Sequence, residues 1–326
     1  MGEIKHLLVT GGAGFIGSNF IRVVLQKYPE LRVTNLDALT YAGNPANLAD
    51  VAQNPRYRFV HGDICDAKLV ADCMKDADAV AHFAAESHVD NSISDPGVFQ
   101  RTNVQGTITL LNAARHANVS RFLHVSTDEV YGSRNEGDFT EDDPLAPSSP
   151  YSASKAASDL FVQSYHKTYG LPVVITRSSN NFGPNQHPEK LIPLFVTNLL
   201  EGKKVPLYGD GMNVRDWIYV TDNCEALDRV LRDGEPGHSY NIPGGNELSN
   251  IEITKRILAA HGKDDSWIQP VQDRPGHDRR YAITGDKVRK LGWKPQHDFA
   301  QALQRTIDWY SANQHWWQPL KGRKKQ

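Results

Sequence analysis

Residues 9–17 read VTGGAGFIG, and this stretch decides the fold of the chain. Gly12, Gly14 and Gly17 have the G-x-G-x-x-G spacing directly after an apolar, strand-like segment. One glycine allows a tight turn, the next lets the backbone approach a diphosphate, and the third lets the following helix pack on the strand. The diphosphate then lies at the positive end of that helix. The stretch therefore predicts a dinucleotide-binding unit.

The flanking sequence alternates short apolar segments with longer helical ones. We predict strands over 6–10, 32–37, 58–62, 79–83, 121–126 and 171–177, and helices that include 16–27, 98–117 and 154–169. This rhythm is typical of an α/β fold with a doubly wound parallel (Rossmann) sheet. Proline and glycine punctuate the later sequence. We therefore predict a Rossmann domain over 1–178 and a smaller, mixed α/β domain mainly over 179–326. A segment near 214–238, with a strand and helix at 216–222, is expected to return to the main sheet.

Composition excludes several classes of protein. The chain has 326 residues, with 36 Lys and Arg against 38 Asp and Glu, a formal charge of −2. This balance offers no strong field for nucleic acid or an anionic membrane. No apolar run approaches the roughly 20 residues that a membrane span needs. The three cysteines lack zinc or disulfide spacing, so we expect reduced thiols, no bound metal and a cytoplasmic location.

A single acidic residue indicates the kind of dinucleotide. Asp37 ends the second predicted strand, twenty positions after Gly17, where a carboxylate accepts hydrogen bonds from the adenosine ribose. It would repel a 2′-phosphate, and Ala38 follows it in place of an arginine, so NAD is favoured over NADP. Asp63 and Ile64, after the third strand, are expected to meet the adenine.

Tyr151 and Lys155 are candidates for proton transfer. They stand four positions apart near the start of a predicted helix, so their side chains share one face. A phenol with a pKa near ~10 is a poor base at neutral pH, but a nearby ammonium and a cationic nicotinamide would stabilise its phenolate. An ordinary amphipathic helix start is the alternative interpretation.

A second candidate lies in the sequence STDEVYG, residues 126–132. Thr127, Asp128 and Glu129 follow the fifth predicted strand, at the edge where ligands bind in doubly wound sheets. Two adjacent carboxyls at one buried site do not both ionise cheaply, so one should keep its proton while the other acts as a base. A solvated acidic turn is the alternative.

Six motifs together resemble the dTDP-glucose 4,6-dehydratase family of extended short-chain dehydrogenases/reductases. They are TGGAGFIG, AAESHVD (84–90), STDEVYG, YSASK (151–155), SSNNFGP (178–184) and DRPGHDRRY (273–281), and they cover nearly the whole chain. The resemblance implies that Tyr151 removes the proton of the sugar 4-hydroxyl as hydride passes from C4 to NAD, with Thr127 and Lys155 assisting. Glu129 then takes the proton from C5, Asp128 protonates the departing 6-hydroxyl, and the hydride returns to C6.

The resemblance also implies which residues contact the ligands. The residues expected to contact NAD are Gly11, Gly12, Gly14, Phe15, Ile16, Gly17, Asp37, Ala38, Leu39, Thr40, Asp63, Ile64, Phe83, Ala84, Ala85, Ser87, Thr102, Tyr151, Lys155 and Asn181. The residues expected to contact the nucleotide sugar are Ser87, Thr127, Asn180, Lys190, Leu191, Pro206, Leu207, Tyr208, Arg215, Asn250, Arg274 and His277. Arg215 and Arg274 suit the diphosphate, because a guanidinium binds phosphate oxygens in pairs.

Three alternatives to a dTDP-glucose dehydratase stay open. A UDP-glucose 4,6-dehydratase differs in its nucleotide, and a UDP-sugar 4-epimerase shares the glycine motif and Tyr-x-x-x-Lys but usually lacks the Asp-Glu pair. A non-catalytic NAD-binding regulator is disfavoured because all five candidate catalytic residues are present. The resemblance further implies a homodimer that pairs the helices at 98–117 and 154–169 of each subunit.

Overall fold

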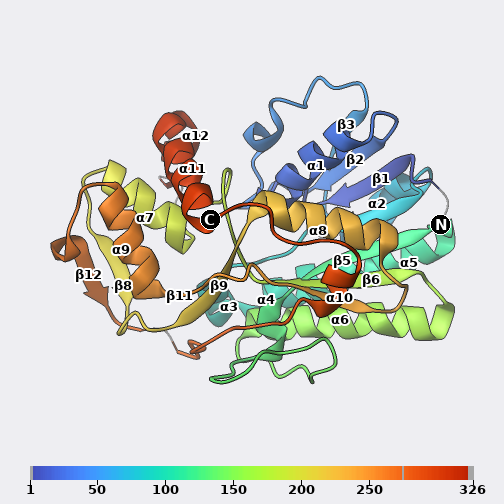
Figure 1. The fold of residues 1–326 in the computed structure, drawn as a ribbon. Helices are drawn as coiled ribbons and strands as arrows, with labels where there is room; N and C mark the ends of the chain where they lie inside the picture. The colour runs from blue at the N-terminus through green and yellow to red at the C-terminus, as the bar shows by residue number, and fades with distance from the viewer. Residues whose placement is uncertain (1–2, 274, 322–326) are drawn as a thin grey trace.

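A seven-stranded parallel sheet forms the larger part of the molecule (Figure 1). The computed structural model describes residues 3–273 and 275–321. Along the sheet the strands run β10-β6-β5-β4-β1-β2-β3, and every neighbouring pair is parallel. Their bounds are β1 (His6–Thr10), β2 (Arg32–Asp37), β3 (Tyr57–His61), β4 (Ala79–His82), β5 (Arg121–Thr127), β6 (Val173–Ser178) and β10 (Ser239–Ile242). The six strands predicted from sequence are confirmed to within two residues at each end.

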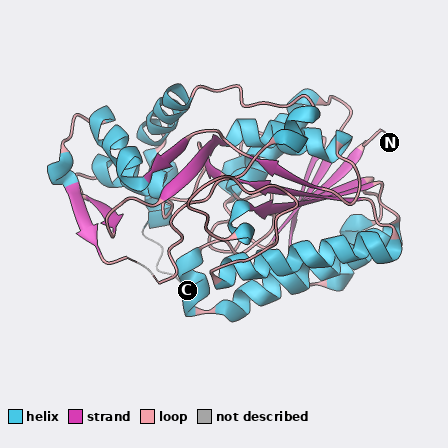
Figure 2. Cartoon of the chain, turned by 60° about the horizontal axis from the view of Figure 1, so that its bottom comes forward, coloured by secondary structure: helices cyan, strands magenta, loops and turns pink. Residues whose placement is uncertain are grey.

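Helices cover both faces of this sheet, which confirms the doubly wound architecture (Figure 2). On one side lie α1 (Phe15–Lys27) and α8 (Val220–Asp233), and on the other α2 (Ala67–Met74), α5 (Thr107–Ala117) and α6 (Pro150–Tyr169). Successive side chains of a strand point to opposite faces. Leu7 and Val9 of β1 accordingly join the apolar cluster beneath α1 and α8, while Leu8 joins the cluster beneath α5 and α6.

Helix α6 begins four residues before the predicted start at Ser154. Ser149 caps it, accepting a hydrogen bond from the Ser152 backbone N–H at 3.1 Å, and Pro150 occupies its first turn. The predicted helix over 98–117 is divided into α4 (Pro96–Phe99), a π-helical turn, η2 (Gln100–Gly106), and α5. A shorter helix, α3 (Val89–Ser94), precedes it.

A smaller lobe contains mixed β-structure, as predicted. Strands β7 (Asn180–Phe182) and β9 (Val214–Tyr219) pair in parallel, β11 (Glu247–Ser249) pairs antiparallel to β9, and β8 (Val205–Tyr208) pairs with β12 (Ile268–Val271). The helices of this part of the chain are α7 (Leu191–Leu200), α9 (Asn250–Ala260), α10 (Asp286–Lys290), α11 (Phe299–Ala312) and α12 (Gln314–Lys321). All except α10 contribute to a third apolar cluster.

We predicted that the strand and helix near residues 216–222 return to the main sheet, and for the strand, β9, this prediction is wrong. Strand β9 lies in the three-stranded sheet, and the seventh strand of the main sheet is β10, which pairs with β6. Helix α8, directly after β9, does pack on the main sheet. The chain therefore re-enters the main sheet only after α8, at β10. The division of the chain at residue 178 stays a prediction.

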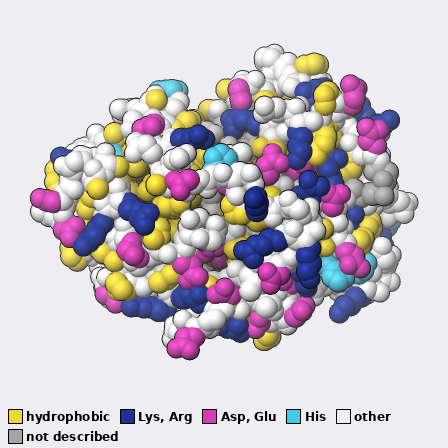
Figure 3. All heavy atoms as spheres, in the orientation of Figure 1, with side chains coloured by type: hydrophobic (Ala, Val, Ile, Leu, Met, Phe, Trp, Pro, Cys, Tyr) yellow, Lys and Arg dark blue, Asp and Glu magenta, His cyan; other side chains and the backbone are white. Residues whose placement is uncertain are grey.

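The exterior carries charges of both signs. Over the face drawn in Figure 3, Lys and Arg side chains are interspersed with Asp and Glu. Within residues 3–273 and 275–321, none of the helices has both the length and the apolarity needed to cross a bilayer. In the same ranges, no group of three or more His, Cys, Asp or Glu side chains is arranged to hold a metal ion.

Candidate active site

The glycine loop joins β1 to α1 at the carboxyl edge of the main sheet. Gly11 has φ +70°, and a Cβ there would lie 2.5 Å from the backbone nitrogen of Ala84, so both the turn and the close approach require glycine. Helix α1 starts after Gly14 without a side-chain cap. Its first N–H groups therefore suit an anion such as a diphosphate.

Asp37, at the end of β2, is held rigidly beside this loop. Its two carboxylate oxygens accept hydrogen bonds from the backbone N–H groups of Ala13 and Leu39, each at 2.8 Å. Burial raises the pKa of Asp37, and these two hydrogen bonds lower it. The carboxylate is thus held in a fixed orientation at the edge of the cavity, and its contact with a ribose stays a prediction.

A cavity of about 410 Å³ runs along this edge of the sheet and unites most of the predicted cofactor and catalytic residues. The predicted residues that line it are Gly11, Gly14, Phe15, Ile16, Gly17, Asp37, Ala38, Thr40, Asp63, Ile64, Phe83, Ala84, Ala85, Ser87, Thr102, Thr127, Asp128, Glu129, Tyr151, Lys155, Asn180, Asn181 and Lys190. Gly12 and Leu39 do not line it: Gly12 donates its N–H to Asn35 at 3.0 Å, and Leu39 donates to Asp37.

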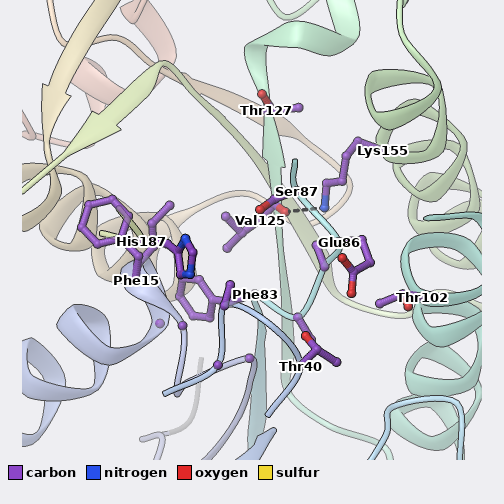
Figure 4. A pocket seen from close by; sticks show the side chains of 18 of the residues that line it. Phe15, Thr40, Phe83, Glu86, Ser87, Thr102, Val125, Thr127, Lys155 and His187 are labelled. Atoms are coloured by element: carbon purple, nitrogen blue, oxygen red, sulfur yellow. Dashed lines mark hydrogen bonds between the residues drawn. The ribbon is translucent and has the colours of Figure 1, made fainter. Parts of the chain in front are cut away.

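Tyr151 and Lys155 enter this cavity from the first two turns of α6. The Lys155 Nζ donates to the backbone oxygen of Val125 in β5 at 2.8 Å (Figure 4). Burial lowers the pKa of Lys155 to about 8, although the charge of Asp159 raises it. Burial raises the pKa of the Tyr151 phenol, the charge of Glu129 raises it further, and a hydrogen bond with Thr127 lowers it. The phenol therefore needs nearby positive charge before it can act as a base.

Asp128 and Glu129 lie in η3 (Asp128–Tyr131), a 3₁₀ turn directly after β5. Thr127 Oγ1 donates to Asp128 Oδ1 at 3.2 Å and accepts from the backbone N–H of Glu129 at 3.3 Å. Burial raises the pKa of Asp128 well above its usual range, and the charges of Glu129 and Asp216 raise it further. Asp128 is thus suited to be the protonated acid of the pair, and the neighbouring Glu129 carboxyl is the candidate base.

A second cavity, of about 260 Å³, continues from the first toward the smaller lobe. The predicted substrate residues that line it are Ser87, Asn180, Lys190, Leu191, Pro206, Leu207, Tyr208, Arg215, Asn250 and His277. Thr127 lies in the first cavity instead, and Arg274 lies outside the described residues. Lys190 Nζ donates to the backbone oxygen of Ser87 at 3.0 Å, so the two cavities meet at a fixed contact.

Sequence reasoning missed several residues of this site. Glu189 lines both cavities, and Trp217 and Tyr281 line the second. Glu189 and Tyr281 stand inside or beside recognised motifs, and that proximity is the signal that could have found them. Trp217 is only 5% exposed, and its indole Nε1 has no hydrogen-bond partner among the described residues.

A buried network behind the site was also missed. Arg177 Nε donates to Asp159 of α6 at 2.9 Å, and Arg177 Nη1 donates to the Tyr131 hydroxyl of η3 at 2.6 Å. The Tyr131 hydroxyl in turn donates to Asn241 of β10 at 2.8 Å. Because α6 carries Tyr151 and η3 carries Asp128, Arg177 connects the two elements that supply the site.

The chain belongs to the family whose model is described as GDP-mannose 4,6 dehydratase, which matches residues 8–306. Among its relatives is a dTDP-glucose 4,6-dehydratase of Streptomyces antibioticus, 54% identical over 98% of this chain and 96% of the relative. The low-salt glycan biosynthesis protein Agl12 of Haloferax volcanii is 57% identical over 93% of this chain and 98% of its own length.

Solved structures show the same likeness. A crystal structure of the dTDP-glucose 4,6-dehydratase DesIV from Streptomyces venezuelae, with NAD bound, superposes with a TM-score of 0.95 at 57% identity, over 97% of this chain and 99% of that one. A Thermus thermophilus UDP-glucose 4-epimerase in complex with NAD has a TM-score of 0.87 at 32% identity, over 94% and 99%. Dehydratases and 4-epimerases therefore share this fold, and the site must distinguish them.

Proposed function

We propose that the chain is an NAD-dependent dTDP-glucose 4,6-dehydratase, a hydro-lyase that forms dTDP-4-keto-6-deoxyglucose. The observation that carries the proposal is the Asp128–Glu129 pair in the same cavity as Tyr151 and Lys155. An epimerase needs one proton-transfer group and a hydride acceptor, whereas elimination also needs an acid and a base. The relatives and the DesIV structure support the same activity and the same nucleotide sugar.

The larger cavity fits NAD. It offers the uncapped start of α1 for the diphosphate and the fixed carboxylate of Asp37 for the ribose. The buried Oδ1 of Asn181, a residue that lines this cavity, has no partner among the described residues, so it is available to a ligand amide. NAD bound there supplies the acceptor for hydride from C4 and the donor of hydride to C6.

Side chains of the protein carry out the proton transfers of the reaction. Tyr151 takes the proton of the sugar 4-hydroxyl, while the Lys155 ammonium and the Thr127 hydroxyl stabilise the phenolate. The 4-ketone acidifies C5–H, and Glu129 accepts that proton. Asp128 gives its proton to the 6-hydroxyl, which leaves as water, and Glu129 later returns its proton to C5. Proton exchange with solvent then restores Tyr151 and Asp128.

Product analysis tests this function. The purified protein is incubated separately with dTDP-glucose, UDP-glucose and GDP-mannose, and the masses of the products are determined by mass spectrometry. We expect loss of one water from dTDP-glucose, and deuterium placed on C4 should reappear in the methyl group. A product of unchanged mass would indicate epimerisation, and faster dehydration of UDP-glucose would assign the alternative nucleotide.

The proposed enzyme is a homodimer. The elements expected to pair, α4 to α5 and α6, carry exposed apolar side chains: Val98 is 43% exposed, Leu160 57%, Phe161 40% and Tyr169 51%. Fully burying an apolar side chain is worth about 1.5–3 kcal/mol, so covering the exposed half of each is worth roughly half of that. Light scattering after size exclusion should give twice the chain mass, and Leu160→Glu should give the mass of one chain.

A cytoplasmic location stays a prediction.

A further inference from the structure

The backbone oxygen of Ala13, in the middle of the glycine loop, is held from behind the cofactor cavity. It accepts hydrogen bonds from the Asn44 backbone N–H at 3.0 Å and from Asn47 Nδ2 at 2.8 Å. Asn47 lies in the short turn η1 (Pro45–Leu48) and is 1% exposed. The Ala13 N–H is also engaged, by Asp37. Asn47 therefore helps to fix the orientation of the peptide groups around Ala13.

Asn47 is itself fixed by the last helix of the described chain. Its side-chain oxygen accepts a hydrogen bond from the indole N–H of Trp316 in α12 at 2.9 Å, across 269 positions of sequence. Asn185, in the loop after β7, makes a longer contact of 3.4 Å with the same oxygen. Trp316 is 8% exposed, so the indole–amide hydrogen bond is shielded from water.

Helix α12 is anchored firmly enough to hold Trp316 in place. The neighbouring Trp317 donates its indole N–H to the backbone oxygen of Tyr310 in α11 at 2.8 Å, and the Tyr310 hydroxyl donates to the backbone oxygen of Gln186 at 2.5 Å. The Trp316 ring packs against Trp309, with ring centroids 5.0 Å apart. The match to the family model ends at residue 306, before α12.

We propose that Trp316 and Asn47 form a strap that keeps the glycine loop in its NAD-binding shape and slows the release of NAD. The inference rests on the proposed function, because a dehydratase that must give back its hydride gains from a cofactor that stays bound through the cycle. Without the indole N–H, the Asn47 amide is oriented by the 3.4 Å contact of its oxygen with Asn185 and by its own hydrogen bond to Ala13. The donor to the Ala13 oxygen is then held less firmly, and the loop around the diphosphate loosens.

Trp316→Phe tests the strap because it keeps an aromatic ring and deletes the donor. The holoenzyme is freed of excess NAD, and the rate at which bound NAD leaves is followed by rapid gel filtration. Because Trp316→Phe removes one buried hydrogen bond, we expect NAD to leave about tenfold faster. Release at the unmodified rate would overturn the proposal.

Trp293→Phe is the matched control, since it also removes a buried indole donor, which here bonds the backbone oxygen of Asp222 at 3.1 Å and not Asn47. It should leave the rate of NAD release unchanged, even if it lowers the midpoint temperature of unfolding as much as Trp316→Phe does. Equal acceleration by both variants would overturn the proposal, because it would indicate general loosening.

A second variant separates the two halves of the strap. Asn47→Asp keeps the acceptor for Trp316 but replaces the donor to Ala13, so it should also speed release by about tenfold or more, and it serves if Trp316→Phe does not fold. Unchanged release in this variant would overturn the proposal. NAD release is measured without substrate, so a protein that retains NAD but does not dehydrate dTDP-glucose would contradict the proposed function and leave the strap standing.

Discussion

Replacing Glu129 by Gln should separate oxidation from elimination. The change removes the base while keeping the size and hydrogen-bonding capacity of the side chain. Burial is the largest cause of the raised pKa of Asp128, so this carboxyl keeps its proton when the charge of Glu129 is gone and does not take over as the base. Loss of a positioned base costs about 10²- to 10⁴-fold in rate. We therefore expect dehydration to slow by that factor, about 3–5 kcal/mol of activation free energy.

Oxidation at C4 should survive the same change. The charge of Glu129 raises the pKa of Tyr151, so its removal lowers that pKa and makes the phenolate easier to form. In a single turnover with dTDP-glucose, the absorbance of the reduced nicotinamide should rise and persist, while mass spectrometry finds little 4-keto-6-deoxy product.

The matched control is Glu136→Gln, an exposed position on the loop after η3. It should dehydrate dTDP-glucose at the unmodified rate. Unchanged dehydration by Glu129→Gln would refute the role of Glu129, and failure to form reduced nicotinamide would refute the separation of the two steps.

Three further changes test the rest of the site. Tyr151→Phe should slow formation of reduced nicotinamide by about 10²- to 10⁴-fold, and a normal single-turnover signal would exclude Tyr151 as the first base. Asp159→Asn leaves the Arg177 guanidinium buried without its carboxylate, so urea unfolding should show a loss of about 3–5 kcal/mol, and a loss within experimental error would refute the importance of that pair. The same variant should lower the pKa of Lys155 below about 8, because Asp159 raises it; the ammonium is then lost at lower pH, and the alkaline decline of the oxidation rate should move in that direction. Asp37→Ala should weaken NAD binding by about 10- to 100-fold in equilibrium titration, and unchanged affinity would remove Asp37 from the ribose site.

Local sequence determined the main sheet and much of the site. The glycine loop is recognisable because a tight turn with close backbone approach leaves little choice of residue, as the positive φ of Gly11 and its proximity to Ala84 show. Asp37 and Thr127 end strands and Asp128 follows one, and the strands are readable from their apolar composition. Parallel strands bring their carboxyl ends to one edge, so these residues meet there.

Tertiary structure decided what depends on segments far apart in the chain. It placed β10 rather than β9 beside β6, brought Glu189 to the junction of the two cavities, and joined Trp316 to Asn47 across 269 positions. It also buried Asp128, and burial is the main cause of the raised pKa of this carboxyl. Periodicity and motif spacing record what a residue does with its near neighbours, whereas burial and long-range hydrogen bonds arise only when distant segments pack together.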